Sequence, residues 1–249
     1  MIPSLVVFIV MSLAIGSFLN VVIDRLPARE SIVVGASHCP NCQHLLAPVD
    51  LVSGLSYLWL RGRCRYCKAS IPVRVPLVET TTGILFGFLY WEFGLGVELG
   101  IAFVYGSILL AISVIDLEHQ LILNVVVFPY ILVALGVLLL SPDPTLVCAV
   151  LGLVVGVALV SLPFLIYRRG MGLGDVYLGG LIGLMVGFPH VLVALYLAVV
   201  GGGLVAILLL VLRIKGRKDA IPFGPYMAAA AMITLHWGEA ILDWYRPQV

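Results

Sequence analysis

Two aspartates, each at the junction of a long apolar run and a polar segment, are the residues of this chain best suited to chemistry. Asp116 ends the apolar run in ISVIDLEHQ, and Asp175 follows the glycine-rich segment GMGLG. A carboxylate at a bilayer face is costly, so it usually serves a function. Two facing carboxylates cannot both ionise, so the ionised one can activate water while its neutral partner polarises a carbonyl. The pattern therefore predicts a membrane aspartyl hydrolase.

Each aspartate also has a purely structural interpretation. Asp116 would face headgroup water at the inner end of its helix, and Asp175 would be the N-cap of the helix that follows it. Capping alone does not require Gly172 and Gly174, which remove side chains beside Asp175 and let the backbone bend, unwind or approach another chain closely. We therefore expect these two glycines to support a catalytic Asp175.

Four cysteines form two Cys-x-x-Cys pairs within the long polar segment 24–76. They are Cys39, Cys42, Cys64 and Cys67. Two such pairs are typical of a structural zinc site with four thiolate ligands, and the basic residues around the second pair would favour the thiolates. Disulfides or free thiols are the alternatives, and a reducing cytoplasm disfavours the disulfides. His38 and His44 flank the first pair and could replace a thiolate. With four protein ligands, the predicted zinc ion has no open position for catalysis.

The elements that must position these residues are long apolar helices. The chain has 249 residues, of which 62% are hydrophobic and 11% charged, which excludes an ordinary soluble domain. Only helices and closed barrels satisfy their backbone in lipid, and these apolar runs are too long for barrel strands. The runs cover residues 3–23, 76–91, 100–115, 125–140, 145–167, 176–188, 191–212 and 224–242. We predict an all-α polytopic membrane protein with about eight transmembrane helices and a small cytosolic zinc ribbon.

The basic residues predict which side of the membrane each loop faces. If the N-terminus is outside and eight helices follow, every Lys and Arg except Arg246 falls in a cytoplasmic loop. Asp116 and Asp175 then lie at the cytoplasmic face. Glycines 152 and 156 and the run 201–203 predict close helix packing. The predicted domains are a first transmembrane helix over 1–23, a cytosolic zinc-binding loop over 24–76 and a multi-helix membrane peptidase domain over 77–249.

Several segments, in the right order, resemble the type IV prepilin peptidase family. They are GSFLNVVIDRLP from Gly16, the CPNC and CRYC pairs, DLEHQ from Asp116, GMGLGD ending at Asp175, and IPFGP from Ile221. The resemblance implies a GxGD-type aspartyl protease of a bacterial inner membrane, acting in type IV pilus assembly or type II secretion. It implies cleavage of the basic leader of prepilins or pseudopilins after a glycine, with Asp116 and Asp175 as the catalytic pair and the four cysteines as zinc ligands.

The resemblance also implies a second activity, in which the new N-terminal residue is methylated with S-adenosylmethionine. The zinc loop is the part found in bifunctional members of the family. No dinucleotide-type GxGxxG turn is visible in the sequence. Glu79, near the inner end of the second helix, is a candidate for the methyl-donor site, with a water-facing role as its alternative. Asn20, Asp24 and Arg25 are candidates of the same kind.

Other classes of protein also bury carboxylates beside glycines. A small transporter would do so, but the chain shows no internal repeat and both aspartates map to one face rather than to the midplane. A membrane anchor whose zinc ribbon recruits a partner would leave GMGLGD unexplained. Another GxGD intramembrane protease remains an alternative on motifs alone. Two positions depart from the family: Leu123 stands where a proline is common, and Tyr177 where a lysine is common.

Overall fold

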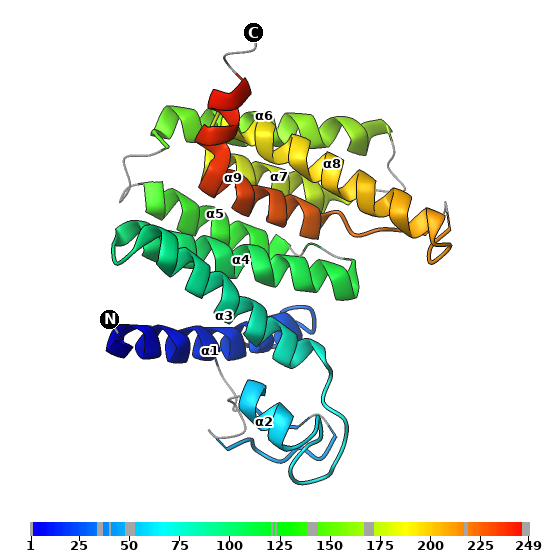
Figure 1. Ribbon diagram of the computed structural model, residues 1–249. Helices are drawn as coiled ribbons and strands as arrows, with labels where there is room; N and C mark the ends of the chain where they lie inside the picture. The colour runs from blue at the N-terminus through cyan, green and yellow to red at the C-terminus, as the bar shows by residue number, and fades with distance from the viewer. Residues whose placement is uncertain are drawn as a thin grey trace. The chain divides into compact units, whose positions relative to one another are not determined.

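A computed structural model gives the structure of residues 2–33, 37–39, 41–47, 53–120, 122, 124–138, 144–166, 172–216 and 219–245. These residues form α-helices and two isolated β-bridges, and the prediction of an all-α protein is confirmed for the part described (Figure 1). The chain divides into two compact units, Met1–Ser107 and Ile108–Val249.

The first unit is built on two long helices that pack side by side. It contains α1 (Ile2–Arg25), the short α2 (Ser53–Trp59), α3 (Arg74–Phe93) and the first part of α4 (Val97–His119). The α1 and α3 helices approach closely at Gly16, where a Cβ atom would lie 2.9 Å from the Cα of Glu79. At the C-terminal end of α1 and the start of α3, the Arg74 guanidinium pairs with the Asp24 carboxylate at 2.6 Å. These contacts fix the two ends of the polar loop that lies between α1 and α3.

In the second unit, several helices pack around one buried helix. It contains the rest of α4 and then α5 (Asn124–Leu138), α6 (Leu146–Ile166), α7 (Leu173–Val186), α8 (His190–Val211) and α9 (Gly224–Tyr245). The α7 helix packs against α5, α6, α8 and α9, and every residue from Leu178 to Val186 is buried (Figure 1). A helix that is apolar on all sides is expected to be central. The segment that carries Asp175 therefore belongs to the core of this unit.

Glycines let α6 and α7 approach at backbone distance. A Cβ atom at Gly152 would collide with the carbonyl oxygen of Gly183, and one at Gly156 with the carbonyl oxygen of Gly179. The predicted close packing at these two α6 glycines is confirmed. In α8 the prediction is right at Gly202 alone, where a Cβ atom would lie 3.3 Å from the Tyr226 ring; the positions on either side of it are open.

Each predicted apolar run contains a helix, and its ends lie within a few residues of the predicted ones. Among the described residues, α4, α6 and α8 are long and apolar enough to cross a membrane, and α5 and α7 contain shorter apolar stretches. Five of the basic residues used for topology lie outside the described residues, namely Arg168, Arg169, Arg217, Lys218 and Arg246.

The start of α7 differs from the prediction. The helix begins at Leu173 with Gly172 as its N-cap, so Asp175 lies in the first turn rather than in front of the helix. The predicted start of this helix lies after Asp175. However, an acidic side chain is favoured in a first turn, where unpaired N–H groups give the helix end a positive character.

Candidate active site and metal centre

Asp116 lies in the last turn of α4 and is held by the start of another helix. Its side chain is buried, with 5% exposure, and its Oδ2 accepts a hydrogen bond of 2.9 Å from the backbone N–H of Gly224, the first residue of α9. The positive end of α9 thus points at the carboxylate. A Cβ atom at position 224 would lie 2.7 Å from the same oxygen. The contact therefore requires glycine.

Gly224 is a site residue for which the sequence analysis gave no role. It stands between Pro222 and Pro225 in the segment IPFGP, a pattern that marks a turn leading into a helix. That signal predicts where α9 begins, and it says nothing of the partner of the Gly224 N–H group. The partner lies 108 residues away along the chain.

Asp175 is held by its own helix. Its Oδ2 accepts a hydrogen bond of 3.0 Å from the backbone N–H of Gly172, and its own N–H donates to the Gly172 carbonyl at 3.2 Å. The side chain is half-buried. The reciprocal bonds make Asp175 the acidic member of an N-terminal capping arrangement, which fixes the orientation of the carboxylate.

The structure brings the two aspartates together within the second unit. The Asp175 carboxylate lies within electrostatic range of Asp116. The α7 helix packs against α9, the helix whose first N–H holds Asp116. In surroundings from which water is largely excluded, such a pair tends to share one proton. The arrangement can therefore supply an ionised base and a neutral acid from the same unit.

The two glycines before Asp175 have different roles in the structure. A Cβ atom at Gly174 would lie 2.6 Å from both the Cβ and the carbonyl oxygen of Ile122, in the segment that links α4 to α5. The close approach predicted at Gly174 is therefore made by the chain itself. Gly172 has an extended backbone with φ −89° and ψ 155°, and a Cβ atom there would meet Asp175 Oδ2 at an ordinary 3.7 Å. Neither its conformation nor its surroundings require a glycine.

Of the two departures from the family pattern, one lies in the described residues. The Tyr177 ring packs against Phe128 of α5, with ring centroids 5.5 Å apart. An aromatic contact between α5 and α7 thus stands where the family commonly has a lysine. Leu123 lies outside the described residues.

The four cysteines of the polar loop converge on one point. Their sulfur atoms all lie within 4.8 Å of one another, and the Sγ atoms of Cys39 and Cys67 are 3.8 Å apart. A tetrahedral zinc site with Zn–S bonds of about 2.3 Å would place its sulfurs about 3.8 Å apart. The cluster of four cysteines can therefore hold a metal ion, and neither His38 nor His44 belongs to it.

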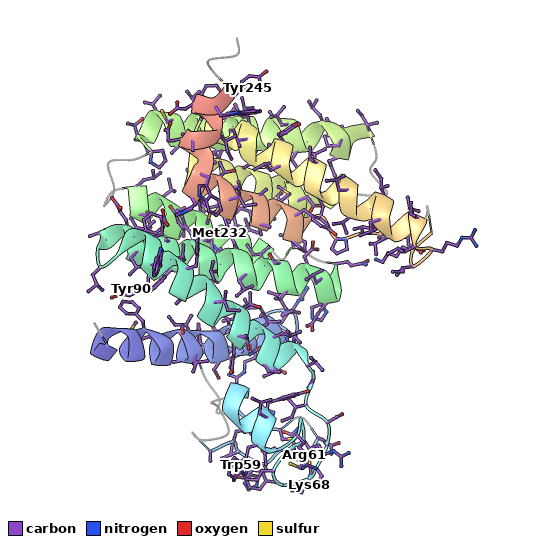
Figure 2. The ribbon with its side chains drawn as sticks, viewed as in Figure 1. Trp59, Arg61, Lys68, Tyr90, Met232 and Tyr245 are labelled. Carbon is purple, nitrogen blue, oxygen red and sulfur yellow. The ribbon has the colours of Figure 1, made fainter. Side chains whose placement is uncertain are left out.

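The two cysteine pairs sit in matching turns. In the first, the Cys39 N–H bonds the His44 carbonyl and the Gln43 N–H bonds the Cys39 carbonyl; in the second, Cys64 bonds Ala69 and Lys68 bonds Cys64 in the same way. The residue after each pair has a left-handed backbone, with φ 57° at Gln43 and 61° at Lys68. Arg61 and Lys68, labelled in Figure 2, flank the second turn.

The turns also prepare a thiolate. The backbone N–H of Ala69 and the side-chain amide of Asn41 lower the pKa of the Cys67 thiol to about 6. The Asn41 nitrogen lies 3.6 Å from the Cys67 sulfur. In the same cluster, desolvation and the neighbouring sulfurs of Cys67 and Cys39 raise the pKa of the Cys42 thiol to about 11. Because the thiolate is the form that binds metal, a metal ion would have to displace the protons that the cluster retains.

The candidates for the methyl-donor site lie in the first unit. Glu79 is buried in α3, with 1% exposure, and its own atoms make the close contact of α3 with Gly16 of α1. A cavity of about 620 Å³ lies at the C-terminal end of α1, and its lining includes Asn20, Asp24 and Arg25. Glu79 is not part of that lining.

Two family models match the chain. Residues 10–93 match the bacterial peptidase A24 N-terminal domain, and residues 103–207 match the type IV leader peptidase family. No solved structure matches it.

Curated relatives match over almost the whole length. The prepilin leader peptidase/N-methyltransferase of Stutzerimonas stutzeri is 35% identical over 95% of this chain and 92% of its own length. The protein of the same name from Pseudomonas aeruginosa is 34% identical over 95% of this chain and 91% of its own. That from Bacillus subtilis is 28% identical over 96% of both. With both family models matched in order and such relatives spanning it, this chain belongs to the type IV leader peptidase family.

Proposed function

We propose that this protein is a membrane aspartyl endopeptidase that removes the basic leader of type IV prepilins or pseudopilins, cutting after a glycine. The observation that carries the proposal is the pair of fixed carboxylates: Asp116 is bound to the first N–H of α9, Asp175 is bound in the first turn of α7, and the charge of one acts on the other. The relatives that match the chain are named prepilin leader peptidases.

The pair suits hydrolysis by water without a covalent intermediate. The ionised carboxylate removes a proton from a water molecule as that water attacks the scissile carbonyl carbon. The neutral carboxyl donates its proton to the carbonyl oxygen and so stabilises the tetrahedral intermediate. Collapse of the intermediate breaks the C–N bond, and the amine leaves with the proton that the base had taken up. As the new carboxylic acid forms, the carboxyl that acted as the acid takes back a proton from a hydroxyl group of the intermediate. Both carboxyl groups then return to their starting states.

The membrane arrangement proposed for this activity has eight spanning helices, namely α1 and α3 to α9, in a bacterial inner membrane. The distribution of Lys and Arg supports cytoplasmic positions for the polar loop and for the two aspartates. The proposed domains remain residues 1–23 for the first helix, 24–76 for the cytosolic zinc loop and 77–249 for the peptidase domain. A substrate leader rich in Lys or Arg would be presented on that same side.

We also propose that the protein methylates the new N-terminal amine, because its relatives carry N-methyltransferase in their names. S-adenosylmethionine supplies an activated methyl group when it is bound. Another GxGD protease or a small transporter would share the buried carboxylates, but neither would account for relatives with this pair of activities over the whole chain.

A cleavage assay tests the proposed function. Purified protein is mixed with a peptide that carries a basic leader, Gly-Phe and an apolar helix, and the products are analysed by mass spectrometry. We expect a cut between Gly and Phe, and one added methyl group on the product when S-adenosylmethionine is present. Cleavage at unrelated positions in other transmembrane peptides would favour a general intramembrane protease instead.

We further propose that the four cysteines of the loop bind a structural zinc ion, and changing one ligand should then remove the zinc. Cys67→Ser should remove most of about one equivalent of bound zinc and destabilise the loop, because a structural site needs all four ligands. Elemental analysis of the purified protein measures the metal. Cys148→Ser is the matched control, since Cys148 lies in α6 outside the cluster. Equal zinc in Cys67→Ser and wild type would contradict a four-cysteine site.

The close contact at Gly174 predicts a steric effect on catalysis. In Gly174→Leu, the side chain must displace Ile122 and shift the first turn of α7, which holds Asp175. A displacement of about 1 Å at a catalytic group costs on the order of 100-fold in rate. Gly136→Leu is the control, since Gly136 in α5 has open space around it. Peptide cleavage at the wild-type rate by Gly174→Leu would show that the contact does not position Asp175.

A further inference from the structure

We propose that the cavity at the C-terminal end of α1 is the binding site for S-adenosylmethionine, an assignment that rests on the methyltransferase function proposed above. The cavity measures about 620 Å³ and is lined by the end of α1, the polar loop with its cysteine pairs and the start of α3, all in the first unit. Sites for small cofactors typically measure about 300–1,000 Å³. The size therefore suits a nucleoside joined to an amino acid.

Asn20 gives this cavity an unused hydrogen-bond acceptor. The side chain has 7% exposure, and its Nδ2 donates to the Val75 carbonyl at 3.1 Å, which fixes the amide. Its Oδ1 is buried and accepts no hydrogen bond from any residue in the described part of the chain. A buried acceptor without a donor is rare in folded proteins and calls for a ligand or a water. The exocyclic amine of adenine is a suitable donor, because asparagine side chains commonly pair with that group.

The charged residues of the cavity match the other end of the same molecule. Asp24 and Arg74 form an ion pair of 2.6 Å, and Arg25 donates to the Ser31 carbonyl at 3.0 Å. S-adenosylmethionine carries a carboxylate, an ammonium, a sulfonium and two ribose hydroxyls. Guanidinium groups bind carboxylates strongly, and an acidic side chain is the usual partner of ribose hydroxyls. Both kinds of group are thus present in one cavity, together with the buried amide.

The cluster of four cysteines forms part of the wall of this cavity. Cys39 and Cys64, the first cysteine of each pair, are buried and line the cavity, and Tyr57 lies beside them with its ring against Gly62. A metal ion bound by the four cysteines would fix the loop that closes the cavity. A structural metal in this loop would therefore support the methyl-donor site rather than the two aspartates.

Binding measurements on the full-length protein in detergent test this site. S-adenosylmethionine is titrated into wild type, Asn20→Ala and Asp24→Asn, and the dissociation constants are compared. We expect each variant to bind at least about 10-fold more weakly. Both should cleave prepilin peptide within about twofold of the wild-type rate, because Asp116 and Asp175 belong to the other unit. Glu92→Gln is the control: it removes an exposed charge at the far end of α3, outside the cavity lining.

Ultraviolet cross-linking of radiolabelled S-adenosylmethionine gives a second readout that does not depend on any variant. Label is expected on peptides from the end of α1 or from the loop residues that line the cavity. If wild type binds the donor but both variants bind equally well, or if the label falls on the second unit, the assigned site is wrong. If wild type cleaves peptide but neither binds the donor nor methylates, the methyltransferase function fails, and the site with it.

Discussion

Asp116→Asn and Asp175→Asn are each expected to lower prepilin cleavage by about 10³-fold or more, while the protein still folds. Asparagine keeps the size of the side chain and its oxygen acceptor, so the hydrogen bonds from Gly224 and Gly172 can remain. It cannot ionise or carry the shared proton. Since the two carboxylates act as a unit, the loss of either should remove most of the catalysis, and the double variant should be little worse than each single one.

The chain offers a close control for each change. Asp219 accepts a hydrogen bond of 2.7 Å from the backbone N–H of Gly216, in the same way that Asp175 accepts one from Gly172. Unlike Asp175, Asp219 is exposed and lies between α8 and α9. Glu118 is exposed in α4 two residues after Asp116. Asp219→Asn and Glu118→Gln should keep near wild-type turnover of the peptide. Comparable turnover in Asp175→Asn would remove Asp175 from the catalytic pair.

Features with a local cause could be predicted from the sequence. The long apolar runs were expected to form helices, because a backbone in lipid must make its hydrogen bonds within its own segment. The Cys-x-x-Cys spacing brings two sulfurs of each pair near one ion, and the structure joins the two pairs into one cluster. Gly152 and Gly156, four residues apart in α6, lie on one helix face and so predicted a close contact.

Features that depend on distant partners could not be predicted. The bond between Gly224 and Asp116 joins residues that only the packing of α4 and α9 brings together. Gly172 and Gly174 look equivalent in the sequence, but Ile122 crowds one and nothing crowds the other. Asn20 looked like one polar residue among several. Only the structure shows that its amide nitrogen donates to the Val75 carbonyl, while its amide oxygen is left without a donor among the described residues.

Gly224→Ala should lower cleavage by about 100-fold without lowering stability. The added methyl group would lie 2.7 Å from Asp116 Oδ2, so the carboxylate must move away and lose its bond to the N–H at the start of α9. The backbone at the N-terminus of α9 forms part of the buried contact and has little freedom to yield. Misplacing a catalytic group by about 1 Å typically costs this much in rate.

Stability separates this effect from unfolding. The matched controls are Gly201→Ala and Gly203→Ala in α8, where an added Cβ atom meets open space. These should cleave peptide like wild type. A thermal midpoint for Gly224→Ala within a few degrees of wild type, together with the loss of turnover, would identify Gly224 as the residue that positions Asp116. Wild-type turnover would mean that Asp116 can act without the N–H group of α9.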